Sequence, residues 1–193
     1  ELQITIQDEL CVELAGLVHD LGHGPFSHLF DATVLPALGA VNFHHEHASV
    51  NLFDLLIEEN QLEPEFQRYG LEAHHRHFIK ELVLGSKKEA DDVPGFKWVG
   101  QPPEKMFLYD IVANKRNGVD VDKLDYFARD CHMLHLSCSF DSQRLMRNSR
   151  VISVVRDGLE ATEICFNHKS AFDLYDFFHT RHSLYKRAYF HKV

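Results

Sequence analysis

The most distinctive stretch of the chain lies at residues 19–28 and reads HDLGHGPFSH. It follows an apolar repeat with helical spacing, formed by Leu10, Leu14, Leu17 and Leu21. Glycine and proline residues then break the helix. The imidazole of His19 and the carboxylate of Asp20 are good ligands for first-row metals, and side chains in the last turn of a helix can converge on one ion. A lone His-Asp pair is most often an ordinary helix end, but this longer run predicts a metal site.

Helices are expected along most of the chain. The first should begin with Asp8 as its N-cap, and further helical patterns cover residues 46–60, 78–83 and 107–114. Residues 85–103 are rich in glycine, proline and charge, which predicts a surface loop. After Gly118 a long helix is expected, with an inner stripe formed by Val121, Leu124, Ala128 and Cys131.

One segment breaks the helical pattern. Residues 151–155 and 159–166 are β-rich and flank Asp157-Gly158, which predicts a hairpin. Ser170 should then cap a final helix, with an inner stripe formed by Leu174, Phe177, Leu184 and Ala188. Arg181 falls on the same stripe, where a charge is unfavourable unless it meets an anion. The predicted fold class is therefore mostly α with one small β-hairpin.

Composition limits the classes of function. The 193 residues suit one domain, and 20 Lys and Arg against 29 Asp and Glu give a net charge of −9. This charge argues against a broad nucleic-acid or membrane surface. No apolar run has the length of a signal peptide or a membrane span. The four cysteines form no CxxC pair, and Cys11 and Cys131 are expected to be buried free thiols in a reducing compartment. Because the chain opens without Met and stops within a helical pattern, we expect it to be part of a longer protein.

A second motif, NGVDVDKLDYFARD, occupies residues 117–130. Asp122, Tyr126, Arg129 and Asp130 can share one helical face. A solvated acidic face is the ordinary interpretation of such a run. Here acid, base and aromatic residues alternate on that face while the other side is apolar. We therefore expect Asp122 to complete the metal site that His19 and Asp20 begin.

These two motifs, with HHEHAS at residues 44–49 and FHTRHSLYKRAY at 178–189, resemble the HD superfamily. Within it they are similar to the SAM- and HD-domain-containing deoxynucleoside triphosphate triphosphohydrolases. The resemblance implies an HD-type helical phosphohydrolase domain over residues 1–193, which lacks the family's N-terminal and C-terminal parts. It implies metal-dependent hydrolysis of dNTPs, including dGTP, to deoxynucleoside and inorganic triphosphate. It also implies an intracellular protein of the nucleus, the cytoplasm or both.

The resemblance assigns roles at the reaction centre. His19, Asp20 and Asp122 would bind a divalent or transition metal: Zn, Fe, Mn or Mg. His45 would be the catalytic histidine that acts on the leaving oxygen of the phosphate ester. Glu46 beside it is expected to raise the pKa of the imidazole and orient it. A further histidine ligand of the family would lie before the first residue of this chain.

The resemblance also assigns a set of substrate-binding residues: His23, His28, Lys123, Tyr126, Asp130, Arg181 and Tyr189. The two histidines would line the phosphate side, and the two cations would neutralise the triphosphate. Tyr126 would press against the sugar and leave no room for a 2′-hydroxyl, while Asp130 and Tyr189 would hold the 3′-hydroxyl.

Regulation is the last implication. Four residues match positions that bind regulatory GTP or dNTP and bridge subunits into a tetramer: Arg144, Lys169, His191 and Lys192. Three positions depart from the family: Tyr185 stands where a closer relative carries histidine, and Asn167 and Asp173 replace residues that would touch the regulatory nucleotide.

Two other interpretations stay open. The chain is alternatively another HD phosphohydrolase, such as a nucleotidase or a cyclic-nucleotide phosphodiesterase. It is otherwise a non-catalytic regulatory module that binds nucleotides or nucleic acid, although the net charge does not favour nucleic acid. Lys123, Tyr126 and Asp130 favour dNTP hydrolysis because together they would select a deoxyribose.

Overall fold

The computed structural model describes residues 2–40, 43–156 and 158–190. These residues form α1 (Ile6–Val18), α2 (Leu35–Ala37), α3 (His45–Glu59), α4 (Glu63–Arg68), α5 (Ala73–Leu84), α6 (Lys87–Asp91), a 3₁₀ helix at Pro103–Asp110, α7 (Val121–Met133), α8 (Ser142–Arg147), β1 (Ser149–Arg156), β2 (Leu159–Phe166) and α9 (Ala171–Leu184). The expected fold class, mostly helical with one antiparallel hairpin, is confirmed. None of the described helices is long and apolar enough to cross a membrane.

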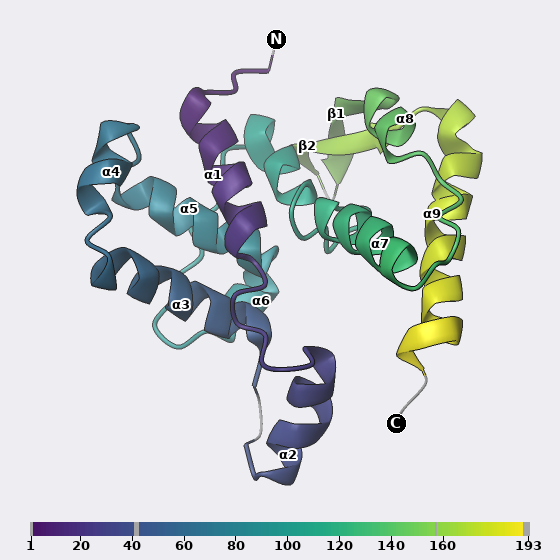
Figure 1. Ribbon diagram of the computed structural model, residues 1–193. Coiled ribbons are helices and arrows are strands. Elements are labelled where there is room, and N and C mark those ends of the chain that lie inside the picture. Colours follow the sequence, from purple (N-terminus) through teal and green to yellow (C-terminus); the bar gives the residue numbers. More distant parts are fainter. Residues whose placement is uncertain (1, 41–42, 157, 191–193) are drawn as a thin grey trace.

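Helix α1 packs against α5, and α5 packs against α3, to form the first hydrophobic core (Figure 1). Thr5 rather than Asp8 is the N-cap of α1. The Thr5 hydroxyl accepts from the Asp8 amide, and the Asp8 carboxylate accepts from the Thr5 amide, which makes a reciprocal capping box. The predicted leucine stripe is only partly correct: Leu10 and Leu14 are half-buried and pack against this core, but Leu17 is 77 % exposed and Leu21 is exposed as well. The buried face lies one residue further on, at Cys11, Ala15 and Val18.

The buried face of α1 is shifted by one residue because α1 and α5 approach each other closely. The Cys11 thiol lies 3.7 Å from the His75 carbonyl oxygen, a separation that a leucine would not permit. Cys11 and Cys131 are buried free thiols, as expected. Burial raises the pKa of Cys11 to about 12, so it stays protonated at neutral pH.

The second core joins α7, α8 and α9 and contains Phe127, Leu145, Phe177 and Leu184. Phe127 is fully buried in α7, whereas Ala128, which was expected on the inner stripe, is exposed. The large aromatic ring of Phe127 fills the space against Phe177, with ring centroids 5.0 Å apart.

Residues 85–103 are more than the surface loop that we expected. They contain α6, and Ala90 and Val93 are buried. The buried carboxylate of Glu81 accepts the amide hydrogens of Val99 and Gly100 and ties the segment to α5.

The hairpin pairs β1 with β2 from Ser149↔Phe166 to Arg156↔Leu159, as its sequence predicted. Gly158 adopts a φ of +80°, and position 157 lies outside the described residues. Hydrogen bonds attach β2 to the 3₁₀ helix: Thr162 donates to Pro103, and Asp110 accepts from the Ile164 amide.

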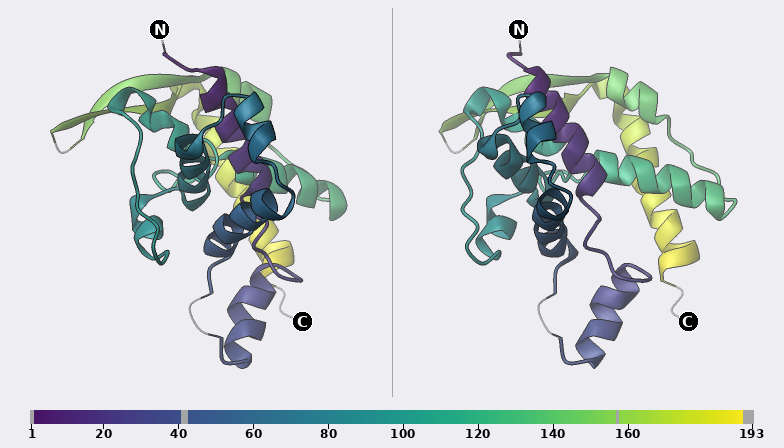
Figure 2. Two further views of the ribbon diagram at one scale, coloured as in Figure 1. Left: turned by 90° about the vertical axis from the view of Figure 1, so that its left-hand side faces the viewer. Right: turned by 60° about the vertical axis from the view of Figure 1, so that its left-hand side comes forward.

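The two cores lie side by side, and the C-terminal end of α1 is near the first turn of α7 (Figure 2). The segment that includes α2 extends away from both (Figures 1 and 2). The HD motif follows the end of α1. It contacts α3 through Ser49 and lies close to Asp122 in the first turn of α7.

Candidate metal centre

Three predicted metal ligands converge where α1 ends and α7 begins. His19 is the C-cap of α1, Asp20 follows it, and Asp122 lies in the first turn of α7. Nε2 of His19 lies 3.3 Å from Asp20 Oδ1 and 3.4 Å from Asp122 Oδ1. One ligand atom from each residue lies within 4.8 Å of the other two, close enough for one ion to reach all three.

Local hydrogen bonds orient these ligands. Nδ1 of His19 donates to the Gly16 carbonyl oxygen at 2.7 Å, which leaves Nε2 free as a metal ligand. Asp120 caps α7 by accepting from the Lys123 amide, and it also accepts from the Asn114 amide. This double anchor fixes the helix start and therefore the position of Asp122.

Helix α3 holds the HD turn, residues 19–28, by hydrogen bonds. The buried hydroxyl of Ser49 donates to the His19 carbonyl oxygen at 2.6 Å and accepts from the Gly22 amide at 2.9 Å. A β-carbon on Gly22 would lie 2.1 Å from the His45 carbonyl oxygen and 2.5 Å from the Ser49 nitrogen. Only glycine permits this approach, which brings the HD turn against the first turn of α3.

The electrostatics of this group favour a cation. Burial alone would lower the pKa of His19, but the hydrogen bond with Asp122 and the charge of Asp20 outweigh it and raise the pKa to about 9. Burial would raise the pKa of Asp122, but the contact with His19 holds it below its usual value. A proton thus resides on the imidazole between two carboxylates. A divalent ion can replace that proton, and this nitrogen and oxygen donor set suits a first-row transition metal.

A second cluster lies next to the first and consists of His23, His28, Asp31 and His45, whose ligand atoms also lie within 4.8 Å of one another. The rings of His23 and His45 stack with centroids 3.8 Å apart, and His28 meets both rings edge-on. His23 Nε2 lies 3.6 Å from Asp20 Oδ1, which links the two clusters. The sequence-predicted catalytic histidine is therefore a neighbour of the predicted metal ligands.

Asp31 was missed by the sequence analysis. Its Oδ2 lies 3.2 Å from Nδ1 of His23 and 3.5 Å from Nδ1 of His45. Both oxygens of Asp31 are buried and make no well-aligned hydrogen bond in the described structure. The available signal was an acid three residues after His28, at the spacing of one helical turn.

The pKa of His45 differs from the expectation. Glu46 lies 3.5 Å from its Nδ1 and favours the protonated ring, but burial and the neighbouring His23 and His28 lower the pKa overall. The ring is therefore neutral at neutral pH until an anion arrives. A bound phosphate would favour its protonation.

The predicted substrate-binding residues of α7, α9 and the turn that follows α9 differ in their surroundings. Lys123 forms an ion pair with Asp120 at 3.0 Å. Tyr189 donates a hydrogen bond to Asp130, so these two residues do lie together. Arg181 is exposed rather than buried on the inner stripe, and its guanidinium carbon lies 4.6 Å from the Tyr185 ring centroid.

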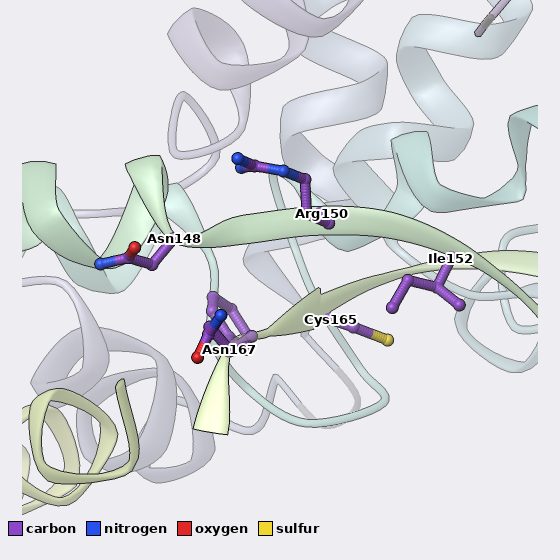
Figure 3. A pocket seen from close by; sticks show the side chains of 6 residues that line it. Asn148, Arg150, Ile152, Cys165 and Asn167 are labelled. Atoms are coloured by element: carbon purple, nitrogen blue, oxygen red, sulfur yellow. The ribbon is translucent and has the colours of Figure 1, made fainter. Parts of the chain in front are cut away.

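Of the four predicted regulatory residues, the structure describes Arg144 and Lys169. Arg144 forms an ion pair with Asp173 at 3.3 Å, and Lys169 is exposed. His191 and Lys192 lie outside the described residues. A cavity of about 200 Å³ opens at the base of the hairpin, and Figure 3 shows Asn148 and Asn167 at one end of it and Ile152 and Cys165 along the strands. It contains none of the predicted metal or substrate ligands.

Comparisons with known proteins agree with the resemblance found in the sequence. Deoxynucleoside triphosphate triphosphohydrolase SAMHD1 of Gallus gallus is 50 % identical over 195 residues, and that of Homo sapiens is 48 % identical over 195 residues. Both alignments cover all of this chain and 31 % and 30 % of the relatives. The putative HD domain-containing protein L394 of Acanthamoeba polyphaga mimivirus is 32 % identical over 95 % of the chain and 34 % of its own length. The chain spans about a third of the curated relatives it matches.

The HD domain family model matches residues 1–130, a range that begins before α1 and ends within α7. It therefore includes His19, Asp20 and Asp122 as well as the His23 and His45 rings. This match covers more than half of the chain, and it shows that the chain belongs to the HD domain family.

Proposed function

We propose that this chain is the catalytic core of a metal-dependent dNTP triphosphohydrolase, in which residues 1–193 form one HD-type phosphohydrolase domain. The observation that carries the proposal is the adjacency of two clusters, His19, Asp20 and Asp122 beside the histidines around Asp31. The SAMHD1 relatives are named deoxynucleoside triphosphate triphosphohydrolases, which supports the same assignment.

His19, Asp20 and Asp122 would hold the metal: Zn, Fe, Mn or Mg. When bound, it would supply Lewis-acid stabilisation of phosphate charge and lower the pKa of a water molecule. The acidic surroundings of His19 support a cation at this place. The remaining residues contribute positioning and proton transfer.

His45 would donate a proton to the departing 5′-oxygen of the deoxynucleoside. Burial and the neighbouring histidines hold its pKa below the ordinary value, and a bound phosphate would favour the protonated ring that can give up this proton. Asp31, in contact with Nδ1 of His45, would orient the ring. His23 and His28 would donate to phosphate oxygens, and Lys123 and Arg181 would neutralise the triphosphate.

The sugar would be selected by α7. Tyr126 and Asp130 lie one turn apart on that helix, and Tyr189 donates to Asp130. We assign Tyr126 to the exclusion of a 2′-hydroxyl. Asp130 and Tyr189 would accept a 3′-hydroxyl between them, because their existing hydrogen bond brings a donor and an acceptor to one point.

Control and location are proposed by resemblance to the longer relatives. Arg144, Lys169, His191 and Lys192 would bind regulatory GTP or dNTP in an allosteric tetramer of the full-length protein, within the nucleus, the cytoplasm or both. Asp173 already neutralises Arg144, so regulatory affinity should be weaker than in a close relative.

The test is a triphosphate-release assay on the full-length protein that carries these residues, with dGTP, dATP, GTP and ATP. Wild-type protein should hydrolyse the dNTPs and leave NTPs almost untouched. His45→Ala should lose turnover by about 10²- to 10⁴-fold while keeping its affinity for a slowly hydrolysed dNTP analogue. The matched control is His132→Ala, an exposed histidine at the end of α7.

Other outcomes identify the alternatives. Equal rates on ATP and dATP, or release of single phosphates, would indicate a different HD phosphohydrolase. Nucleotide binding without any hydrolysis by the metal-loaded protein would indicate a regulatory module.

A further inference from the structure

Arg181 differs from the other cation that we assign to the triphosphate. Lys123 is paired with Asp120 at 3.0 Å and is mostly buried. Arg181 has no carboxylate within 4.0 Å among the described residues, and it is exposed. An arginine without a counter-ion beside an anion-binding site keeps its full charge for the ligand.

Aromatic rings hold Arg181 in place of an acid. Its guanidinium carbon lies 4.6 Å from the centroid of the Tyr185 ring, and Nη2 donates to the Tyr185 hydroxyl at 3.4 Å. The guanidinium also lies near Tyr126 of α7, because its charge acts against the burial that raises the pKa of that hydroxyl. Arg181 and Tyr185 are one helical turn apart, so the contact is built into the end of α9.

Tyr185 is itself braced. Its ring meets the Tyr189 ring edge-on with centroids 5.1 Å apart and meets the Phe190 ring at 5.2 Å. Residues Tyr185–Tyr189 form a π-helical turn, a local widening of the helix that recurs at functional sites. The tyrosine is therefore a fixed platform rather than a free surface ring.

The kind of support matters for the charge. A carboxylate partner would orient a guanidinium but would also neutralise it and compete with phosphate. The face of a tyrosine attracts the cation through its quadrupole and leaves the net charge at +1. An aromatic platform is thus the better support for an arginine that must bind a polyanion.

We propose that Tyr185 is a positioning residue that holds the guanidinium of Arg181 toward the triphosphate of the substrate. This inference rests on the function proposed above. It gives a role to Tyr185, a residue that the proposed function leaves without one.

Substitutions at Tyr185 should change binding rather than turnover. Tyr185→Leu removes the platform and should raise both KM for dNTP and Kd for inorganic tripolyphosphate by about three- to tenfold. The value of kcat should stay within about twofold, because a phosphate contact made equally in the ground state and the transition state affects KM alone. Tyr185→Phe keeps the ring and should restore most of the affinity.

A double-mutant cycle separates positioning from a general structural effect. Arg181→Ala should raise KM, and adding Tyr185→Leu to it should cause no further loss, because the tyrosine then has nothing to hold. Arg181→Lys, which leaves Tyr185 intact, tests the same contact from the other side. It should raise KM by a factor similar to that of Tyr185→Leu, because an ammonium group cannot stack as a plane. Tyr69→Leu, at a tyrosine 58 % exposed and distant from the site, is the matched control.

The outcomes are distinguishable. Wild-type protein that neither binds tripolyphosphate nor releases it from dNTPs overturns the proposed function, and this inference with it. Active wild-type protein with an unchanged KM in Tyr185→Leu and Arg181→Lys overturns the positioning role alone. Additive losses in the double variant do the same, because they mean that Tyr185 acts independently of Arg181.

Discussion

The carboxylate of Asp31 lies 3.2 Å from Nδ1 of His23 and 3.5 Å from Nδ1 of His45. One buried acid thus contacts two rings of the histidine cluster, and a negative charge there fixes which ring nitrogen carries a hydrogen. The contacts are loosely aligned in the free protein. Catalytic hydrogen bonds often tighten only when the substrate binds.

Replacing Asp31 tests whether it orients His45. Asp31→Asn keeps the size of the side chain but removes the charge, so kcat for dNTP hydrolysis should fall by about 10- to 100-fold with a smaller change in KM. Steady-state kinetics on the metal-loaded protein measure both values. Asp125→Asn, at an exposed acid of α7 paired with Arg129, is the control and should behave as wild type. Equal kcat values for the two variants would exclude an orienting role for Asp31.

The sequence predicted the surroundings of some residues but not of others. Asp122 could be placed beside His19 because the apolar stripe of α7 fixes which face of that helix is exposed. The partner of Lys123 could not, since Asp120 serves both as the N-cap of α7 and as the counter-ion of that lysine. Such competition between local partners depends on three-dimensional distances that spacing alone does not encode.

At the scale of elements, the hairpin and the long helices followed from periodicity, and the orientation of α1 did not. Counting apolar residues favours the leucines, but the helix turns its small residues toward α5 because small side chains allow the two backbones to approach. The sequence also did not predict the contact between the HD turn and α3, although Gly22 lies at that contact. A glycine signals a close approach without naming the partner.

Gly22→Ala should therefore destabilise the protein. The new methyl group would overlap the backbone of His45 and Ser49, and the strain should lower the free energy of unfolding by about 2–3 kcal/mol. Gly16→Ala is the matched control, because nothing lies within 4 Å of a β-carbon there and a helical alanine should be neutral or slightly stabilising. Denaturant unfolding of both variants gives the comparison, and equal stabilities would contradict the close approach.

The start of α1 should be sensitive to pH. Burial would raise the pKa of Asp8, but hydrogen bonds from Lys105 and Thr5 outweigh it and hold the pKa below its ordinary value of 3.8. The stabilisation is therefore fully present above pH 3.8 and is lost as pH falls through the lower native pKa. At pH 7, Asp8→Asn should lower the free energy of unfolding by about 3 kcal/mol.

The difference between wild type and Asp8→Asn should shrink as the pH drops below that range. Thermal unfolding at a series of pH values measures it, with Glu9→Gln on the exposed side of the same turn as control. A difference that stays constant down to pH 2 would show that the charge of Asp8 contributes nothing.

At the scale of the whole molecule, the metal ligands belong to different cores. His19 and Asp20 end a helix of the first core, whereas Asp122 begins a helix that contributes Phe127 to the second. An ion bound by all three would join the two halves and stabilise only the folded chain.

Metal should therefore raise the melting temperature. At a free metal concentration of about 100 times Kd, the expected gain is about 2.7 kcal/mol, or roughly 5–10 °C for a chain of this size. Scanning fluorimetry after chelation, with and without added Mn²⁺ or Zn²⁺, measures the shift. Asp122→Ala should lose most of it and Asp125→Asn should keep it. A full shift in Asp122→Ala would remove that residue from the metal site.

The separation of these ligands along the chain also has a consequence for biosynthesis. His19 and Asp122 are 103 residues apart, and a ribosome adding about 5–20 residues per second needs roughly 5–20 s to cover that distance. Throughout that interval the HD turn has been synthesised, whereas Asp122, the third proposed ligand, has not. Capture of an ion by all three proposed ligands would therefore have to wait until α7 has been started, after α1, α3 and α5 have been made.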